Sequence, residues 1–479
     1  MKFWTYCISS LLTCLSLSGC ATSTLFEDYP NKMATNVHDL KQGDYQPAIK
    51  ALDDEQSNQD YELYAAELGR VQQLAGEPAK SSATFLPLMQ KVESDQLQAK
   101  IRASSLLEDS AALMSNDNAI PYQLSGFEIV LLYQFQALNF LNQNDLSDAL
   151  VSLRKANIAQ TTLTAEYQTE LTTANQKINQ NKLDPNFTSS LQTQMADTLS
   201  ASASVKSSFL NAMTYYLFAL ASEANGNWND AAAALKQAIG IMPNNTYLQT
   251  ALLRALQTQG ADQSIINNYL KAFKLKSAPA PLAQNGQLVI WYDQNFIPPL
   301  QSFETPLYLP GLNQSAQFTF PVYKKVSTQP TALQISVQDP LQIQATNLPA
   351  TEMITNVYGL AARQLQQEYP MIFLRQALRI ALQAGIAAPK KNESDSSLLL
   401  AGFTASVMNF ISTYADLRSW LTLPNNTQIG AYDLAPNTYQ VTLQNTQKTS
   451  LTVPIQPGKI TLLWVTQYGS QLKAQIIPL

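Results

Sequence analysis

Residues 215–243, YYLFALASEANGNWNDAAAALKQAIGIMP, decide the fold of the first half of this chain. Apolar and small residues recur at helical spacing on both sides of a turn: Tyr215, Phe218, Ala219, Ala231, Leu235 and Ala238. Gly226 and Trp228 mark the turn. Pro243 ends the second run because proline lacks an N–H group and clashes with the preceding helical turn. The stretch therefore predicts two antiparallel helices whose core includes Trp228, Ala231 and Leu235.

This pattern resembles the tetratricopeptide repeat, a helix–turn–helix unit of about 34 residues, and it recurs upstream. The upstream matches are Tyr133, Ala137, Phe140, Ala149, Leu153 and Ala156; Leu68, Gly69, Gly76, Ser81 and Phe85; and Gly43, Tyr45, Ala48 and Leu52. The resemblance implies a superhelix over residues 33–276. Residues 157–205 interrupt it with a Gln/Thr/Asn-rich stretch that favours long helices. A non-repetitive helical bundle is the alternative.

The pattern changes after residues 277–282, SAPAPL, which form the clearest linker because alternating prolines favour an extended chain. Apolar residues then alternate along five expected strands: residues 288–292, 333–338, 439–443, 451–455 and 460–464. Helical spacing returns at 351–420. The predicted fold class is α+β: a tetratricopeptide-like α-superhelix, then a mainly antiparallel β domain at 283–479 with a helical insertion. We expect the two halves to fold separately.

The N-terminus has the features of a secretory signal. Lys2 supplies a positive charge, and the apolar run of residues 3–17 is too short to cross a hydrocarbon core of about 30 Å. The following Ser18, Gly19 and Cys20 complete a Leu-Ser-Gly-Cys ending that resembles the lipobox of bacterial lipoproteins. This resemblance implies that residues 1–19 are removed and that Cys20 carries lipid.

Cys20 would then begin a lipidated tether over residues 20–32. Cys7 and Cys14 lie inside the signal, so Cys20 would be the only cysteine of the mature chain. A disulfide partner or a conventional cleavage site is the alternative interpretation of Cys20. In lipoproteins of Gram-negative bacteria an aspartate after the cysteine favours the inner membrane. Ala21 stands there instead, and we therefore expect the outer membrane, facing the periplasm.

The composition excludes several classes of function. Charged residues make up 14% of the chain and the net charge is −5, so no basic surface for nucleic acid is expected. The single histidine, His38, leaves neither a zinc site of the usual kind nor a Cys–His pair. No phosphate-binding glycine loop occurs. The acidic run Asp53, Asp54 and Glu55 is interpreted as a solvated surface. We therefore predict no catalytic, metal-binding or cofactor-binding residues.

Two further segments have structural interpretations. Glu128 lies on an apolar helix and is expected to pair with Arg154 or Lys155 of the following helix. In residues 415–424, ADLRSWLTLP, Asp416 and Arg418 are expected to pair locally or to bind backbone, and Trp420 to fill the seam between helix and strand. Together with the lipobox, these segments resemble an uncharacterised family of bacterial lipoproteins with tetratricopeptide-like repeats. The resemblance implies an envelope role and no assigned activity.

Three functions follow as hypotheses. The first is a non-enzymatic, membrane-anchored scaffold or adaptor that binds a protein or peptide through the concave face of its repeats. The second is a carboxylate-dependent envelope hydrolase, which needs two acids about 5–10 Å apart in a cleft. The third is a small-ligand carrier with a pocket between the two halves.

Overall fold

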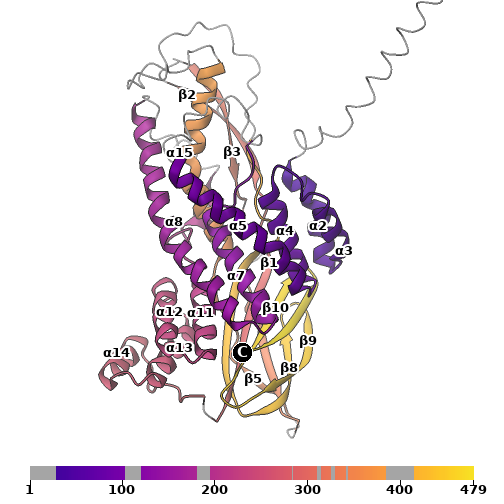
Figure 1. Cartoon of the computed structure of the whole chain (residues 1–479), viewed down its shortest axis with the longest axis vertical. Helices are drawn as coiled ribbons and strands as arrows, with labels where there is room; N and C mark the ends of the chain where they lie inside the picture. The colour runs from indigo at the N-terminus through magenta and orange to yellow at the C-terminus, as the bar shows by residue number, and fades with distance from the viewer. Residues whose placement is uncertain are drawn as a thin grey trace, which may run out of the picture.

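The computed structural model describes residues 28–102, 120–180, 195–282, 284–309, 314–324, 329–340, 344–383 and 415–479. Helices come first along the chain: α2 (Tyr29–Gln42), α3 (Gln46–Asp53), α4 (Tyr61–Leu74), α5 (Pro78–Arg102), α7 (Gly126–Asn142), α8 (Leu146–Gln180), α10 (Ala196–Ser202), α11 (Ala212–Ala224), α12 (Trp228–Ile241), α13 (Thr246–Thr258) and α14 (Gln263–Phe273). The predicted α+β class is confirmed, since the sheets follow these helices (Figure 1).

The sheets contain eleven described strands and one helix between them. These elements are β1 (Gly286–Phe296), β2 (Gln301–Leu309), β3 (Gln314–Val322), β4 (Gln334–Gln338), β5 (Thr346–Leu348), β6 (Glu352–Thr355), α15 (Val357–Gln383), β7 (Pro424–Leu434), β8 (Asn437–Gln444), β9 (Lys448–Ile455), β10 (Ile460–Tyr468) and β11 (Gln471–Pro478). The strands expected from alternating residues correspond to β1, β4, β8, β9 and β10.

Five helix pairs turn on a residue with a left-handed backbone. These residues are Gly43, Gly76, Asn144, Gly226 and Gly260. Glycine and asparagine tolerate this conformation because other side chains would clash with the backbone. Between α4 and α5 the packing is close: a Cβ on Gly69 would lie 2.2 Å from the Phe85 ring. The small and large residues of the repeated pattern therefore meet where the two helices cross.

A five-stranded sheet forms the centre of the second half, in the order β11-β10-β1-β7-β6. β1 pairs antiparallel with β7 but parallel with β10, with Gln287 opposite Ile460. The described strands are mainly antiparallel, as expected, but the central sheet is mixed because of the parallel β1–β10 pair. Alternation of apolar residues predicts a strand and its buried faces, but it carries no information about the direction of the neighbouring strand.

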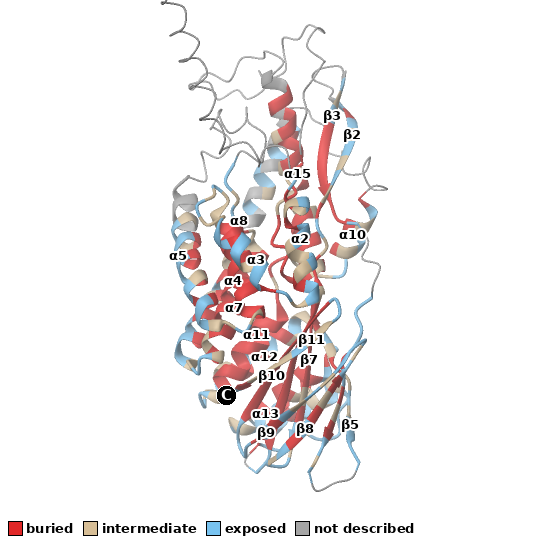
Figure 2. Cartoon of the chain, turned by 90° about the vertical axis from the view of Figure 1, so that its right-hand side faces the viewer, coloured by how far each residue is buried: buried red, intermediate tan, exposed pale blue. Residues whose placement is uncertain are grey.

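β1 is buried on both faces because it lies in the middle layer. On one face, Asp293 contacts Arg70 of α4. On the other, Asn445 donates a hydrogen bond of 2.9 Å to the Tyr292 hydroxyl. Asn445 follows β8 of a four-stranded sheet, β5-β4-β8-β9. The helices and this second sheet thus cover opposite faces of the central sheet (Figure 2).

The remaining pair of strands, β2 and β3, forms a hairpin that extends beside α15 (Figure 1). α15 packs on β3 through Phe373, whose ring centroid lies 5.2 Å from that of Phe318. The predicted insertion at 351–420 is helical over the length of α15, while residues 384–414 lie outside the described ranges. Residues 415–423, which we call the inserted segment, contain neither helix nor strand.

The first described helix begins earlier than the predicted domain boundary, and the two halves share one core. α2 begins at Tyr29, capped by the Asp28 side chain, so a helix starts within residues 20–32, which were expected to be tether. Residues 277–282 contain no helix or strand, as expected of a linker. Yet one continuous apolar core extends from α2 to β11. The expectation of two halves that fold separately does not fit this shared core.

Candidate functional site

The inserted segment lies in the groove between α4, α5 and α7. Buried glutamates hold its backbone. Glu67 of α4 accepts hydrogen bonds from the amides of Leu421 (2.6 Å) and Thr422 (3.1 Å), and Glu128 of α7 accepts one from the Trp420 amide (3.0 Å). Burial raises the pKa of Glu67 to about 7 and also raises that of Glu128. Carboxylates on the helices thus bind the main-chain amides of the turn at residues 420–422.

Two side chains fix the position of the inserted segment. The Trp420 ring is 1% exposed and makes edge contacts with Phe85 of α5 and Phe135 of α7, at 6.2 and 6.1 Å between centroids. Arg418 pairs with Asp416 at 2.7 Å and with Asp60, the residue before α4, at 2.6 Å. The local pairing of Asp416 and the contact of Arg418 with a carboxylate are confirmed. Trp420, expected to fill the seam between helix and strand, packs instead between α5 and α7.

This arrangement changes the interpretation of the repeat groove. We expected its concave face to bind a partner, but between α4 and α7 the groove holds the chain's own residues 415–423. The sequence could not reveal this, because the contacts join positions more than 290 residues apart, as between Glu128 and Trp420. Residues 120–125 are held in a related way, since Glu62 of α4 accepts a hydrogen bond of 2.8 Å from the Leu124 amide.

The predicted pairing of Glu128 with Arg154 or Lys155 is wrong. Glu128 is a capping-box residue of α7, bound to Ser125, and it also accepts hydrogen bonds from the Tyr122 hydroxyl. Lys155 pairs instead with Glu93 at 2.6 Å, and the Arg154 guanidinium lies over the Phe218 ring at 5.8 Å. The N3 position of Glu128 in the capping box explains the difference, because the Ser125 amide at the helix start competes with a distant cation for the carboxylate.

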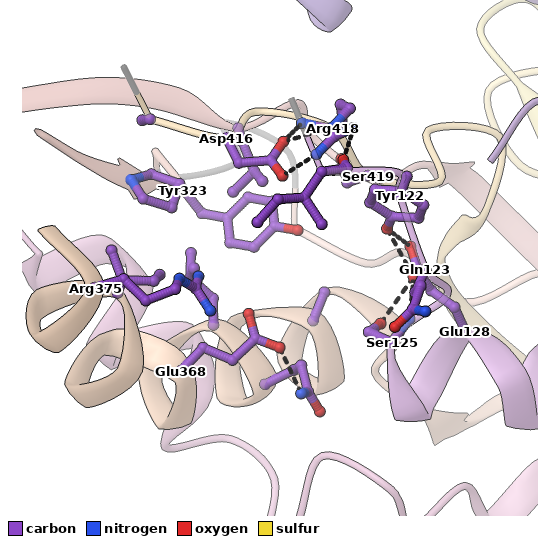
Figure 3. A pocket seen from close by; sticks show the side chains of 18 of the residues that line it. Tyr122, Gln123, Ser125, Glu128, Tyr323, Glu368, Arg375, Asp416, Arg418 and Ser419 are labelled. Atoms are coloured by element: carbon purple, nitrogen blue, oxygen red, sulfur yellow. Dashed lines mark hydrogen bonds and ion pairs between the residues drawn. The ribbon is translucent and has the colours of Figure 1, made fainter. Parts of the chain in front are cut away.

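A cavity of about 240 Å³ adjoins the inserted segment and is the candidate site (Figure 3). Five parts of the described chain line it: residues 120–128, Leu300, the end of β3 through Tyr323, one face of α15, and residues 415–419. It therefore lies between the helical half and the β half. The hypothesis of a pocket between the halves describes this location, although the lining combines charged and polar side chains with apolar ones.

The carboxyl groups at the cavity differ in the number of hydrogen bonds that they accept. Glu128 accepts hydrogen bonds from Tyr122, Ser125 and Trp420, and Asp416 accepts three from Arg418. Glu368 of α15 accepts one hydrogen bond, from Gln364 Nε2 at 2.7 Å. Burial raises the pKa of Glu368, and the nearby carboxyl groups of Glu128 and Asp416 raise it further, while Arg375 lowers it. Glu368 is thus the carboxyl group of this cavity that remains able to bind a ligand.

Tyr323 supplies the second available group. Its side chain is 4% exposed, and its hydroxyl forms no hydrogen bond to any residue in the described ranges. Figure 3 shows the Tyr323 hydroxyl and the Glu368 carboxylate pointing into the cavity from different walls. Burial raises the pKa of Tyr323 well above its ordinary value, so the phenol stays protonated at neutral pH. Sequence reasoning found neither residue, since no motif surrounds them.

The largest buried polar cluster lies elsewhere, between α4 and the central sheet. Arg70 and Asp293 form an ion pair of 3.0 Å in which both side chains are 0% exposed. Asp293 also accepts hydrogen bonds from the indole groups of Trp291 and Trp464, at 2.8 and 3.1 Å. Every contact is internal, which indicates a structural role for this cluster.

The remaining predicted residues have these positions. Ala231 and Leu235 are fully buried, but Trp228 is only half-buried, so its expected core position is confirmed in part. His38 is exposed, and so are Asp53 and Asp54, in agreement with the surface interpretation. Cys20 lies outside the described residues.

The described residues contain no group of three or more His, Cys, Asp or Glu side chains arranged to hold a metal ion. None of the helices in the described ranges has both the length and the apolar character needed to cross a membrane.

Comparison with known proteins gives little. No family model matches the chain, and no curated protein matches it. Two solved structures, both described as crystal structures of MamA, are 13% identical to the chain at a TM-score of 0.29. They cover 52% of this chain and 92% and 96% of their own. At this TM-score the likeness supports no statement about the function of this chain.

Proposed function

We propose that this protein is a non-catalytic interaction protein, held by lipid at Cys20 on the periplasmic face of the outer membrane, which binds a protein or peptide partner through tetratricopeptide-like helix pairs. The observation that carries the proposal is the inserted segment. Glu67 and Glu128 bind the amides of Trp420, Leu421 and Thr422, so this helical array already holds a peptide segment by its main chain. The same mode of recognition suits a partner.

The partner surface proposed is the groove beside α13. The inserted segment occupies the groove at α4–α7, whereas a second cavity of about 200 Å³ remains between α13 and the strands β6 and β7. Arg254 and Asp433 form an ion pair of 2.5 Å there, and Glu352 accepts a hydrogen bond of 2.8 Å from the Thr246 amide. These groups offer donors and acceptors to a polar peptide.

Cross-linking in cells tests this surface. A photoreactive amino acid at Thr250, which lines the α13 groove, is expected to give a discrete product with one partner. The same substitution at His38, which is exposed on α2, is the matched control and is expected to give none. Equal products from both positions, or no product from Thr250, would contradict the proposed surface.

Anchoring is tested at Cys20. Cys20→Ser is expected to leave the precursor unprocessed or to release the protein from the membrane fraction, because stable anchoring needs more than one acyl chain on this residue. Fractionation and mass spectrometry of the N-terminus measure both effects. Membrane attachment that survives the substitution, with cleavage at another position, would remove the anchoring part of the proposal.

The hydrolase hypothesis has less support at the cavity. A two-carboxylate mechanism needs two acids that are free to act as acid and as base or nucleophile. Glu128 is held by the Tyr122 hydroxyl and the Trp420 amide, and Asp416 is paired with Arg418, so Glu368 is the carboxyl group of the cavity with the fewest hydrogen bonds. We therefore expect no turnover of peptidoglycan, peptides or esters by the purified protein. Turnover that is lost in Glu368→Gln at unchanged melting temperature would favour the hydrolase instead.

A further inference from the structure

We propose that the cavity between the inserted segment and α15 is a binding site for a primary alkylammonium group, with Glu368 as its counter-ion and Tyr323 as its hydrogen-bond acceptor. This inference is independent of the α13 surface, because the two cavities share no lining residue. It therefore stands or falls separately from the proposed protein partner.

The charge balance of the cavity favours a cation. Among the described lining residues there are three carboxyl groups, those of Glu128, Glu368 and Asp416, and two guanidinium groups, those of Arg375 and Arg418. Both ends of the Arg418 guanidinium are used, by Asp416 and by Asp60. An added anion would meet the excess of carboxylates, whereas an ammonium group would compensate it.

The available hydrogen-bonding groups also suit an ammonium donor. One oxygen of Glu368 accepts from Gln364, which leaves the rest of the carboxylate open to the cavity. The Tyr323 hydroxyl, buried and without a partner among the described residues, has its oxygen lone pairs available. A ligand that donates to both groups would add hydrogen bonds, one of them to a charged acceptor, which contributes more free energy than a bond between neutral groups. An ammonium group has three donors in a compact arrangement.

Size restricts the ligand. A cavity of about 150 Å³ is large enough for benzene, so the 240 Å³ found here fits on the order of ten non-hydrogen atoms. The apolar wall from Leu300, Leu365 and Ile372 suits a short methylene chain behind the ammonium group. Two sources supply this chemistry: a free aliphatic amine, or a lysine side chain of a bound protein.

Calorimetry on the whole mature chain tests the site, with 1,5-diaminopentane and Nα-acetyl-lysine methylamide as separate probes. We expect at least one of them to bind, and 1,5-pentanediol, which is neutral and of similar length, not to bind. Binding of the diamine alone identifies a free amine as the ligand, and binding of the lysine derivative identifies a side chain. Absence of binding by both probes, or equal binding of the diol, would overturn the proposal.

Variants locate the binding. Glu368→Gln keeps the shape of the side chain and is expected to weaken binding at least tenfold. Glu304→Gln, which changes an exposed carboxylate on β2, is the matched control and is expected to leave binding unchanged. Tyr323→Phe is expected to weaken binding several-fold. It provides a second test of the site in case Glu368→Gln does not fold, and the melting temperature of each variant is measured. Undiminished binding in both Glu368→Gln and Tyr323→Phe would place the amine elsewhere and refute the site.

Discussion

Arg70 and Asp293 show how much depends on single residues in this core. Removing one partner of a buried ion pair leaves an uncompensated charge, which costs about 3–5 kcal/mol. We expect Asp293→Asn to lower the free energy of unfolding by about this amount, since Arg70 is completely buried. Arg70→Met is expected to have a similar effect. Urea denaturation measures both.

The double variant provides the control for this prediction. If the two residues act as a pair, the loss in Arg70→Met/Asp293→Asn is smaller than the sum of the single losses. Additive effects, or a loss below about 1 kcal/mol in either single variant, would show that the pair contributes no more than a surface contact.

Glu67 makes stability depend on pH. Its pKa is raised from 4.5 to about 7 by burial, so between these values the folded state holds more protons than the unfolded state. The free energy of unfolding therefore falls as pH rises through this window, and the stability present below pH 4.5 is lost above pH 7, by up to roughly 3 kcal/mol. We expect a negative slope between pH 5 and 8.

The variant Glu67→Gln tests the origin of that slope. Because glutamine does not titrate, the slope is expected to become shallower whatever the absolute stability of the variant. It does not vanish, since the pKa of Glu62 is also raised to about 7 by burial and adds a slope of the same sign. An unchanged slope in Glu67→Gln would assign the pH dependence to other groups.

Two glycines of one helix pair make contrasting predictions at the level of the element. Gly226 has a φ of +75° in the turn between α11 and α12, whereas Gly240 lies within α12, and a Cβ at either position would meet nothing within 4 Å. Gly226→Ala is expected to lose about 1 kcal/mol through backbone strain, and Gly240→Ala to gain about 0.5–1 kcal/mol. Thermal unfolding compares them directly. Equal changes would mean that the turn does not require its left-handed residue.

Much of the secondary structure was predictable because it depends on local spacing. The spacing of apolar residues from Tyr215 to Ala238 predicts α11 and α12. The alternation of apolar residues predicts β8, β9 and β10 with ends that differ from the observed ones by a few residues. The direction of β10 beside β1 and the role of Glu128 were not predictable, because each depends on contacts far apart in sequence. Tyr323 and Glu368 were missed for the same reason. A single sequence offers no sign that the end of β3 and the middle of α15 share a cavity.

The whole molecule is expected to unfold as one cooperative unit. Contacts such as Glu67–Leu421 and Arg70–Asp293 join the helices to the second half, so each part supplies buried charge partners to the other. A fragment of residues 284–479 would leave Asp293 without its cation. We expect this fragment to be unfolded or aggregated by circular dichroism, and the full mature chain to show one transition. A fragment with a cooperative transition of its own would contradict this expectation.

The parallel pairing of β1 with β10 also constrains when the protein can fold. β1 is made first and ends at Phe296, but the strand that covers its second edge begins only at Ile460. At about 5–20 residues per second, synthesis of the missing part takes on the order of ten to thirty seconds. During that delay an apolar strand has an open edge. An open apolar edge is prone to pair with another chain, and a stop codon before β10 would leave this edge open permanently, because it removes both β10 and β11.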